Sequence, residues 1–256
     1  MITKEIKSLQ HSNVKHWVKL RKHPKYRLSS HSVFIEGKKL IQELGRKKRI
    51  KKLIVKIGQP IPPSIVYDEL YLVTEEILAK ISGVVAPEPI AAEISFPEEV
   101  SLNGKKLLLG LDTINDPGNL GTLFRTAFAL GFEGIFLTPM CADPFNEKAI
   151  RAAKGATFFL PFQRGTFDDL KLLIKQNHLH SYIGDMEGEA IDSIAFQFPL
   201  ILILGNEAHG VSEAAKDLSS SVSIPISDEM ESLNVAVAGG ILMQKIREQV
   251  RKNGKQ

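Results

Sequence analysis

The second half of the chain alternates short apolar runs with amphipathic stretches, which is typical of a parallel sheet with helices between its strands. A strand is expected at residues 107–112, whose apolar run is typical of a strand buried on both faces. The other strands are expected at residues 134–138, 158–162, 181–185, 199–204 and 222–226. Helices are expected at residues 120–130, 147–154, 167–176, 213–218 and 233–250. Six strands separated by helices predict an open, mostly parallel α/β sheet covered by helices on both faces.

The first hundred residues predict a smaller α/β unit. Val14, Trp17, Val18 and Arg21 recur at helical spacing among lysines, which indicates a basic amphipathic helix over residues 13–22. Strands are expected at residues 33–36, 52–57 and 70–74, with helices at 38–44, ended by Gly45, and at 75–81, capped by Thr74. Prolines cluster between residues 83 and 104, so the predicted domains are residues 1–100 and 101–256.

Charge is unevenly distributed along the chain. Residues 1–56 hold 17 Lys and Arg against 3 Asp and Glu, a net charge of +14. Residues 57–256 hold 16 against 26, a net charge of −10. A basic N-terminal segment of this kind favours a polyanionic partner, in particular a nucleic acid. A solvated, lysine-rich surface is the alternative.

Composition excludes several other classes. The longest nearly apolar stretch, residues 235–243, is nine residues, whereas a membrane span needs about 20. The first residues lack the apolar segment of a secretory signal, and the single cysteine, Cys141, permits no internal disulfide and no cysteine zinc cluster. We therefore expect a cytoplasmic protein with no membrane segment and no metal. Glycine fingerprints for dinucleotides or P-loop phosphates are absent from the sequence.

Three loops that follow strands carry the candidate chemistry. The first runs from Asp112 to Arg125, where Gly118 and Gly121 permit close approach of the backbone and Asn119 offers both a donor and an acceptor. By itself this segment is equally consistent with a helix-capping loop followed by a solvated arginine.

The second loop follows the strand that ends near Gly205. Asn206 and Glu207 stand where an apolar strand emerges, and Gly210 follows. A carboxylate in that position is costly unless it is paired, so Arg125 is a candidate partner for Glu207. A polar turn without a function is the alternative.

The third loop leads into the last predicted helix. Ser232 and Asn234 precede a run of small residues, 235–240, that permits tight packing of the helix. In the alternative interpretation Ser232 only caps the helix.

Together, these loops resemble the three signature motifs of the SpoU/TrmH family of RNA ribose methyltransferases, within the SPOUT superfamily. The resemblance extends over residues 107–250 and includes residues 143–156, and residues 30–100 resemble the ribosomal-protein-like substrate-binding domain of many members. One departure is Ala208, where the family often has glycine after Asn-Glu. Alanine would strain that backbone if the family geometry needs a positive φ.

The resemblance implies transfer of a methyl group from S-adenosylmethionine to the 2′-hydroxyl of an RNA ribose. Arg125 is then essential for transfer, although a guanidinium is a poor proton acceptor. Two roles stay open for it: either it is forced toward neutrality in the complex, or it orients the hydroxyl and phosphate while a water takes the proton. The implied positioning residues around it are Asn119, Glu207, Ser232 and Asn234. The implied cofactor-binding residues are Gly205, Ile224 and Leu233, followed by Ile226 and Asn206.

The resemblance also implies a C-terminal trefoil knot and a homodimer in which the first motif helix and the last helix meet their counterparts. Ribosomal RNA, of the 23S type, is favoured because a separate substrate-binding domain precedes the methyltransferase domain. Three alternatives stay open: a transfer RNA 2′-O-methyltransferase, a non-catalytic RNA-binding protein, and a different α/β enzyme that binds a nucleotide.

Overall fold

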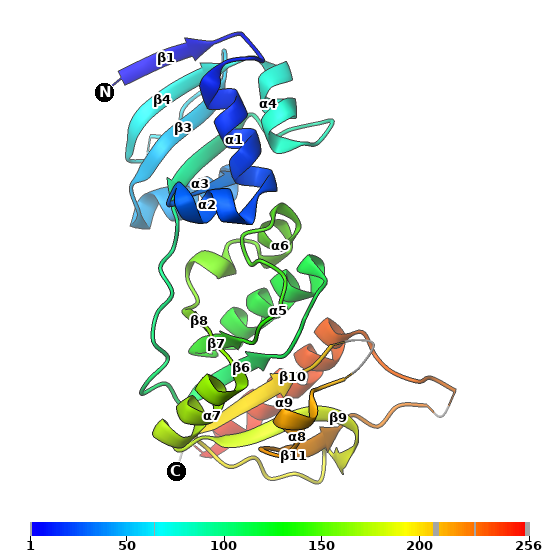
Figure 1. Ribbon diagram of the computed structural model, residues 1–256. Coiled ribbons are helices and arrows are strands. Elements are labelled where there is room, and N and C mark those ends of the chain that lie inside the picture. The colour runs from blue at the N-terminus through cyan, green and yellow to red at the C-terminus, as the bar shows by residue number, and fades with distance from the viewer. Residues whose placement is uncertain (1, 64, 207–209, 228, 254–256) are drawn as a thin grey trace. The chain divides into compact units, whose positions relative to one another are not determined.

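The computed structural model describes residues 2–63, 65–206, 210–227 and 229–253 (Figure 1). The chain divides into two compact units, Met1–Glu98 with Phe145–Glu147, and Glu99–Pro144 with Lys148–Gln256. Among the described residues, no helix combines the length and the apolar character that a membrane span requires. Those residues also contain no group of three or more His, Cys, Asp and Glu side chains placed to hold a metal ion. The absence of a metal stays a prediction.

The first unit contains a five-stranded mixed sheet in the order β1-β4-β3-β5-β2. Its strands are β1 (Ile2–Ile6), β2 (Ser32–Glu36), β3 (Ile50–Lys56), β4 (Tyr67–Val73) and β5 (Ile90–Ser95). β1 and β3 run parallel to β4, whereas β5 is antiparallel to β2 and β3. The sequence analysis missed β1 and β5 because their Lys, Glu and Ala residues are weak strand formers, and sheet pairing overrides that preference.

Helices α1 (Ser12–Lys22) and α4 (Glu75–Ser82) pack on one face of this sheet, and α2 (Pro24–Ser29) follows α1 directly. Thr74 caps α4 by accepting a hydrogen bond from the Ile77 amide, as predicted. The predicted end of the helix at residues 38–44 before Gly45 is wrong. α3 (Lys38–Lys47) continues through Gly45, which is buried so close to Ile65 that a methyl group there would clash.

The second unit contains a six-stranded sheet in the order β11-β9-β10-β6-β7-β8, in which every strand pair is parallel. The predicted α/β class with a parallel sheet is therefore confirmed. The strands are β6 (Leu107–Leu111), β7 (Gly134–Leu137), β8 (Phe162–Arg164), β9 (His180–Ala190), β10 (Leu200–Leu204) and β11 (Ser220–Ser223). β10 lies between β6 and β9, so the loops that follow β6 and β10 start from neighbouring strands.

Helices cover both faces of this sheet (Figure 1). The helices that follow β6 in the chain are α5 (Pro117–Ala129), α6 (Glu147–Ala153), α7 (Phe167–Gln176), α8 (Glu213–Lys216) and α9 (Val235–Asn253), with a short 3-10 helix η1 (Ala156–Phe158). α7 and α8 share one apolar cluster with the sheet, and α5 packs against α9. The strand predicted at residues 158–162 is wrong, because Gly155, with φ of 95°, turns the chain into η1 and delays the strand to Phe162.

Candidate active site

A cavity of about 580 Å³ opens at the carboxyl end of β10, beside residues 184–187 in the middle of β9. Ligands bind parallel sheets at such an edge, and a volume of this size suits a small cofactor. Six of the residues singled out in the sequence line it: Gly205, Asn206, Ile224, Ile226, Ser232 and Leu233. Residues from the second and third loops therefore share one cavity, and their role in cofactor binding stays a prediction.

Close backbone packing fixes the loop after β10. A Cβ at Gly205 would stand 2.3 Å from backbone atoms of Gly210 and Val211, so no larger residue fits without moving the loop. Asn206 and Gly210 exchange two backbone hydrogen bonds, both 2.8 Å. The Asn206 side chain also donates to the Thr113 carbonyl oxygen at 3.0 Å, which ties this loop to the one after β6.

Asp112 forms a second tie between the same two loops. Its carboxylate is buried and accepts hydrogen bonds from the hydroxyls of Thr113 and Thr138 at 3.0 and 3.1 Å. Its other oxygen accepts the Ser212 amide at 2.8 Å. A buried carboxylate needs such donors to offset its desolvation. Sequence reasoning gave Asp112 no role, although its place at the end of a buried strand was a usable signal.

The first loop begins α5 and reaches the third loop. Asp116 caps α5 by accepting the Asn119 amide at 2.9 Å, and Lys148 at 2.7 Å holds the pKa of that carboxyl below its usual range, with the Asn119 bond as the next cause. The Asn234 side chain donates to Asn119 Oδ1 at 3.2 Å. These two asparagines therefore join the start of α5 to the start of α9.

Asn234 also caps α9, since its side-chain oxygen accepts the amides of Ala236 and Val237 at 3.0 and 3.4 Å. The alternative in which Ser232 caps this helix is wrong, because α9 begins at Val235 and Ser232 instead lines the cavity.

Arg125 lies on α5, exposed to solvent, and does not line the cavity. Within the described residues it forms no hydrogen bond or ion pair. Its predicted partner Glu207 lies outside the described residues, as does Ala208, so the pairing stays a prediction. An exposed arginine next to the joined loops is available to a ligand that approaches from outside.

The sequence analysis missed the part of the cavity that β9 and α8 provide. Asp185 and Glu187 of β9 and Lys216 of α8 line the cavity. The Lys216 ammonium lies 3.8 Å from the Asp185 carboxylate and 3.3 Å from that of Glu213. The rule that ligands bind beyond strand ends would have indicated Asp185, which ends the predicted strand.

The lining fits S-adenosylmethionine chemically. Ile224, Ile226 and Leu233 form apolar surface of the kind that an adenine ring packs against. Asp185 and Lys216 provide the charged groups that ribose hydroxyls and an amino-acid end require.

Comparison with known proteins agrees with this geometry. Residues 106–244 match the model of the SpoU rRNA Methylase family, and residues 11–92 match that of the MRM3-like substrate binding domain. The 23S rRNA (guanosine(2553)-2′-O)-methyltransferase RlmP of Bacillus subtilis is 33% identical over 248 residues, covering 95% of this chain and 99% of that protein.

Solved structures show the same similarity. The AdoMet-bound rRNA methyltransferase from Sinorhizobium meliloti has a TM-score of 0.85 at 26% identity, covering 97% of this chain and 98% of that one. The SpoU methyltransferase AviRb from Streptomyces viridochromogenes, in complex with AdoMet, shares the fold with a TM-score of 0.84 at 20% identity, covering 94% and 99% of the two chains.

Proposed function

The chain belongs to the SpoU rRNA methylase family, and on that premise we propose that it methylates a ribose 2′-hydroxyl in large-subunit ribosomal RNA. It is an RNA 2′-O-methyltransferase that uses S-adenosylmethionine. The observation that carries the proposal is the cavity at the carboxyl end of β10. Gly205, Ile224 and Leu233 line it, and hydrogen bonds tie its loops to the loop of Asn119.

The protein's own residues bind and orient the reactants. Bound S-adenosylmethionine supplies a methyl group already activated by its sulfonium sulfur. Ile224, Ile226, Leu233, Gly205 and Asn206 hold that cofactor. The ribose hydroxyl then needs alignment with that methyl group, which is worth several kcal/mol. Its proton passes to a water molecule as the oxygen takes the methyl group.

Arg125 acts on the RNA side in this proposal. Guanidinium groups are strong hydrogen-bond donors, so Arg125 orients the ribose hydroxyl or a neighbouring phosphate by donating hydrogen bonds. Asn119, Asn234, Ser232 and Glu207 position Arg125 and the ribose. The exposure of Arg125 and the bond between Asn119 and Asn234 support this assignment.

A homodimer and a trefoil knot belong to the same proposal. Phe128 on α5 and Val237 and Ile241 on α9 are 46, 53 and 41% exposed. Since α5 and α9 pack together, these apolar side chains support pairing with a second copy through both helices. We also propose that the first unit binds the RNA and that the enzyme works in the cytoplasm.

The test is transfer of labelled methyl groups from S-adenosylmethionine into RNA from cells that lack this gene. We expect label in large-subunit RNA, with Arg125→Ala abolishing transfer while cofactor affinity stays within about twofold of wild type. Label only in transfer RNA would reassign the substrate. Absence of both transfer and cofactor binding would leave a non-catalytic RNA-binding protein and refute the proposal.

A further inference from the structure

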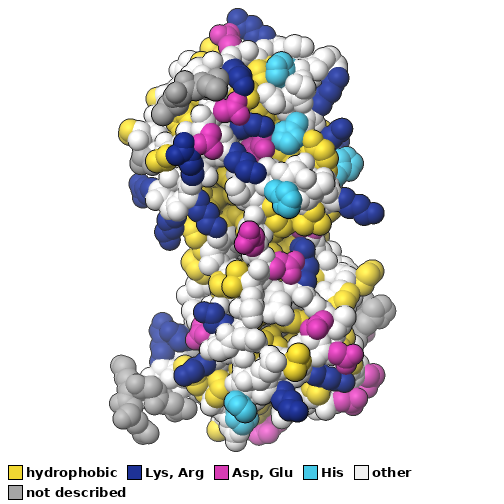
Figure 2. Space-filling view, turned by 60° about the vertical axis from the view of Figure 1, so that its left-hand side comes forward, with side chains coloured by type: hydrophobic (Ala, Val, Ile, Leu, Met, Phe, Trp, Pro, Cys, Tyr) yellow, Lys and Arg dark blue, Asp and Glu magenta, His cyan; other side chains and the backbone are white. Residues whose placement is uncertain are grey.

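Helices α1 and α2 of the first unit carry a row of exposed lysines. Lys15, Lys19 and Lys22 are exposed at positions i, i+4 and i+7 of α1, and Lys25 is exposed on α2. We call these four lysines the α1–α2 stripe. The sequence contains no Asp or Glu between residues 6 and 35. Lys and Arg side chains and histidines are visible over the surface of this unit (Figure 2).

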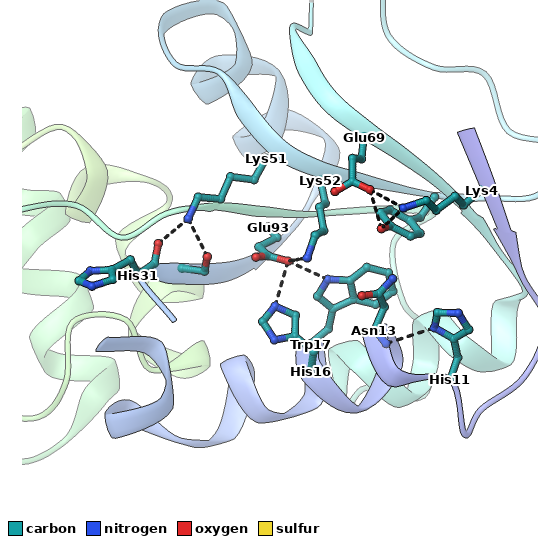
Figure 3. Close-up of polar contacts among 12 residues, drawn as sticks. Lys4, His11, Asn13, His16, Trp17, His31, Lys51, Lys52, Glu69 and Glu93 are labelled. Atoms are coloured by element: carbon teal, nitrogen blue, oxygen red, sulfur yellow. Dashed lines mark hydrogen bonds and ion pairs between the residues drawn. The ribbon is translucent and has the colours of Figure 1, made fainter. Parts of the chain in front are cut away.

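The stripe is a fixed surface because α1 is anchored to the sheet by a buried carboxylate. Glu93 on β5 is 5% exposed at its side chain. Its Oε2 accepts hydrogen bonds from His16 Nε2 and Trp17 Nε1, both at 3.1 Å, and an ion pair from Lys52 Nζ at 3.0 Å (Figure 3). Two of these donors come from α1, so the helix cannot slide or rotate without breaking bonds to a buried charge.

The junction between α1 and α2 is fixed as well. Arg27 is buried and donates to the carbonyl oxygens of Leu20 and Arg21 at 2.7 and 2.9 Å. The Tyr26 hydroxyl and His16 Nδ1 lie 2.8 Å apart, and the Lys19 ammonium lies 5.5 Å from the centre of the Tyr26 ring. These contacts fix the backbone positions from which the lysines of α1 and α2 extend.

Within the described residues, Lys15, Lys22 and Lys25 form no ion pair, so their charges are not neutralised by the protein. From Lys15 to Lys22 the stripe extends about 10 Å along α1, and charges on a nucleic-acid helix lie closer together than that. The stripe can thus reach more than one phosphate. α3 differs, because carboxylates surround its start: Glu88 accepts the Lys38 amide, and Glu36 accepts the Glu88 amide.

We propose that the α1–α2 stripe is the surface through which the first unit binds the phosphate backbone of the RNA substrate. This inference rests on the proposed function, and it names the face of the unit that carries out the RNA binding. Contacts of this kind position the RNA and supply affinity, whereas they contribute no base specificity.

The experiment compares two triple variants that remove equal charge. Lys15→Gln, Lys19→Gln and Lys22→Gln change the stripe, and the matched control changes three exposed residues of α3, Lys38→Gln, Lys39→Gln and Arg46→Gln. Each full-length protein is measured for binding to large-subunit ribosomal RNA from cells lacking the gene, across a KCl series. Emission of Trp17 and cofactor affinity show that each variant is folded.

We expect the stripe variant to bind RNA at least about tenfold more weakly and to lose about 2 to 3 from the slope of log affinity against log salt, since each lost phosphate contact removes about 0.7 to 0.9. The α3 control should change affinity less than about threefold. An equal loss in both variants would show that only net charge matters, and a larger loss in the control would place the RNA on α3. Either result overturns the proposal, whereas methyl transfer by the wild-type protein tests the proposed function separately.

Discussion

The carboxylate of Glu93 should stabilise the first unit strongly, and Glu93→Gln measures by how much. Burial raises the pKa of the Glu93 carboxyl, but hydrogen bonds and charges from His16 and Lys52 outweigh it, and the pKa falls from 4.5 to about 2. Each pKa unit is worth about 1.4 kcal/mol, so the ionised form contributes about 3 kcal/mol to folding at pH 7. Glutamine keeps the volume and removes this contribution.

The sign of the pH dependence follows from the lowered pKa. A carboxyl whose pKa is lower in the folded protein stabilises it fully above pH 4.5 and loses that effect as the pH falls toward 2. The difference in unfolding free energy between wild type and Glu93→Gln should therefore shrink from about 3 kcal/mol at pH 7 to about 1.4 kcal/mol at pH 3.

Trp17 makes the assay specific for the first unit. It is the only tryptophan of the chain, it is fully buried, and it donates a hydrogen bond to Glu93 itself. Urea unfolding followed by its emission at several pH values gives both free energies. Glu69→Gln is the control, because that carboxylate also binds a lysine but is 28% exposed, and its effect should be clearly smaller. A Glu93→Gln effect below about 1 kcal/mol, or one independent of pH, would refute the reasoning.

Three further substitutions test the site. Gly205→Ala should weaken cofactor binding at least about tenfold in calorimetry, because its methyl group displaces the Gly210 backbone. Asn234→Ala should destabilise the protein by about 1 kcal/mol in thermal unfolding through loss of the α9 cap, whereas Ser232→Ala should leave stability unchanged. Gly121→Ala should lower stability by about 2 kcal/mol, since its Cβ would stand 2.3 Å from the Ala149 carbonyl oxygen; an unchanged melting temperature would contradict that packing.

The parallel sheet was predictable because its strands are buried on both faces and read as continuous apolar runs. β6 and β10 are fully buried along their length, and both were found close to their observed bounds. The edge strands were harder. β11 was predicted at residues 222–226 but lies at Ser220–Ser223, because pairing with β9, and not the apolar residues around Ile224, decides which residues form the strand.

The part of the cavity lining that comes from the second and third motif loops could be predicted. Gly205, Ile224 and Leu233 were identified through resemblance, and the structure places them together. The place of Asp112 at the end of a buried strand could have drawn attention to it, but its partners could not be predicted, because Thr138 and Ser212 are 26 and 100 residues away in the chain. Contacts of that range leave no local pattern in a sequence.

The position of β10 at the centre of its sheet has a consequence for biosynthesis. All strands of the first unit are present once Ser95 has been made, whereas β6 and β9 receive their shared neighbour only after Leu204. Until then the apolar edge of β6, Leu107–Leu111, stays unpaired while about a hundred residues are added, and unpaired edges of this kind are prone to aggregate. The strands of the first unit can therefore pair before the rest of the chain is made, whereas the sheet of the second unit closes only when β10 arrives.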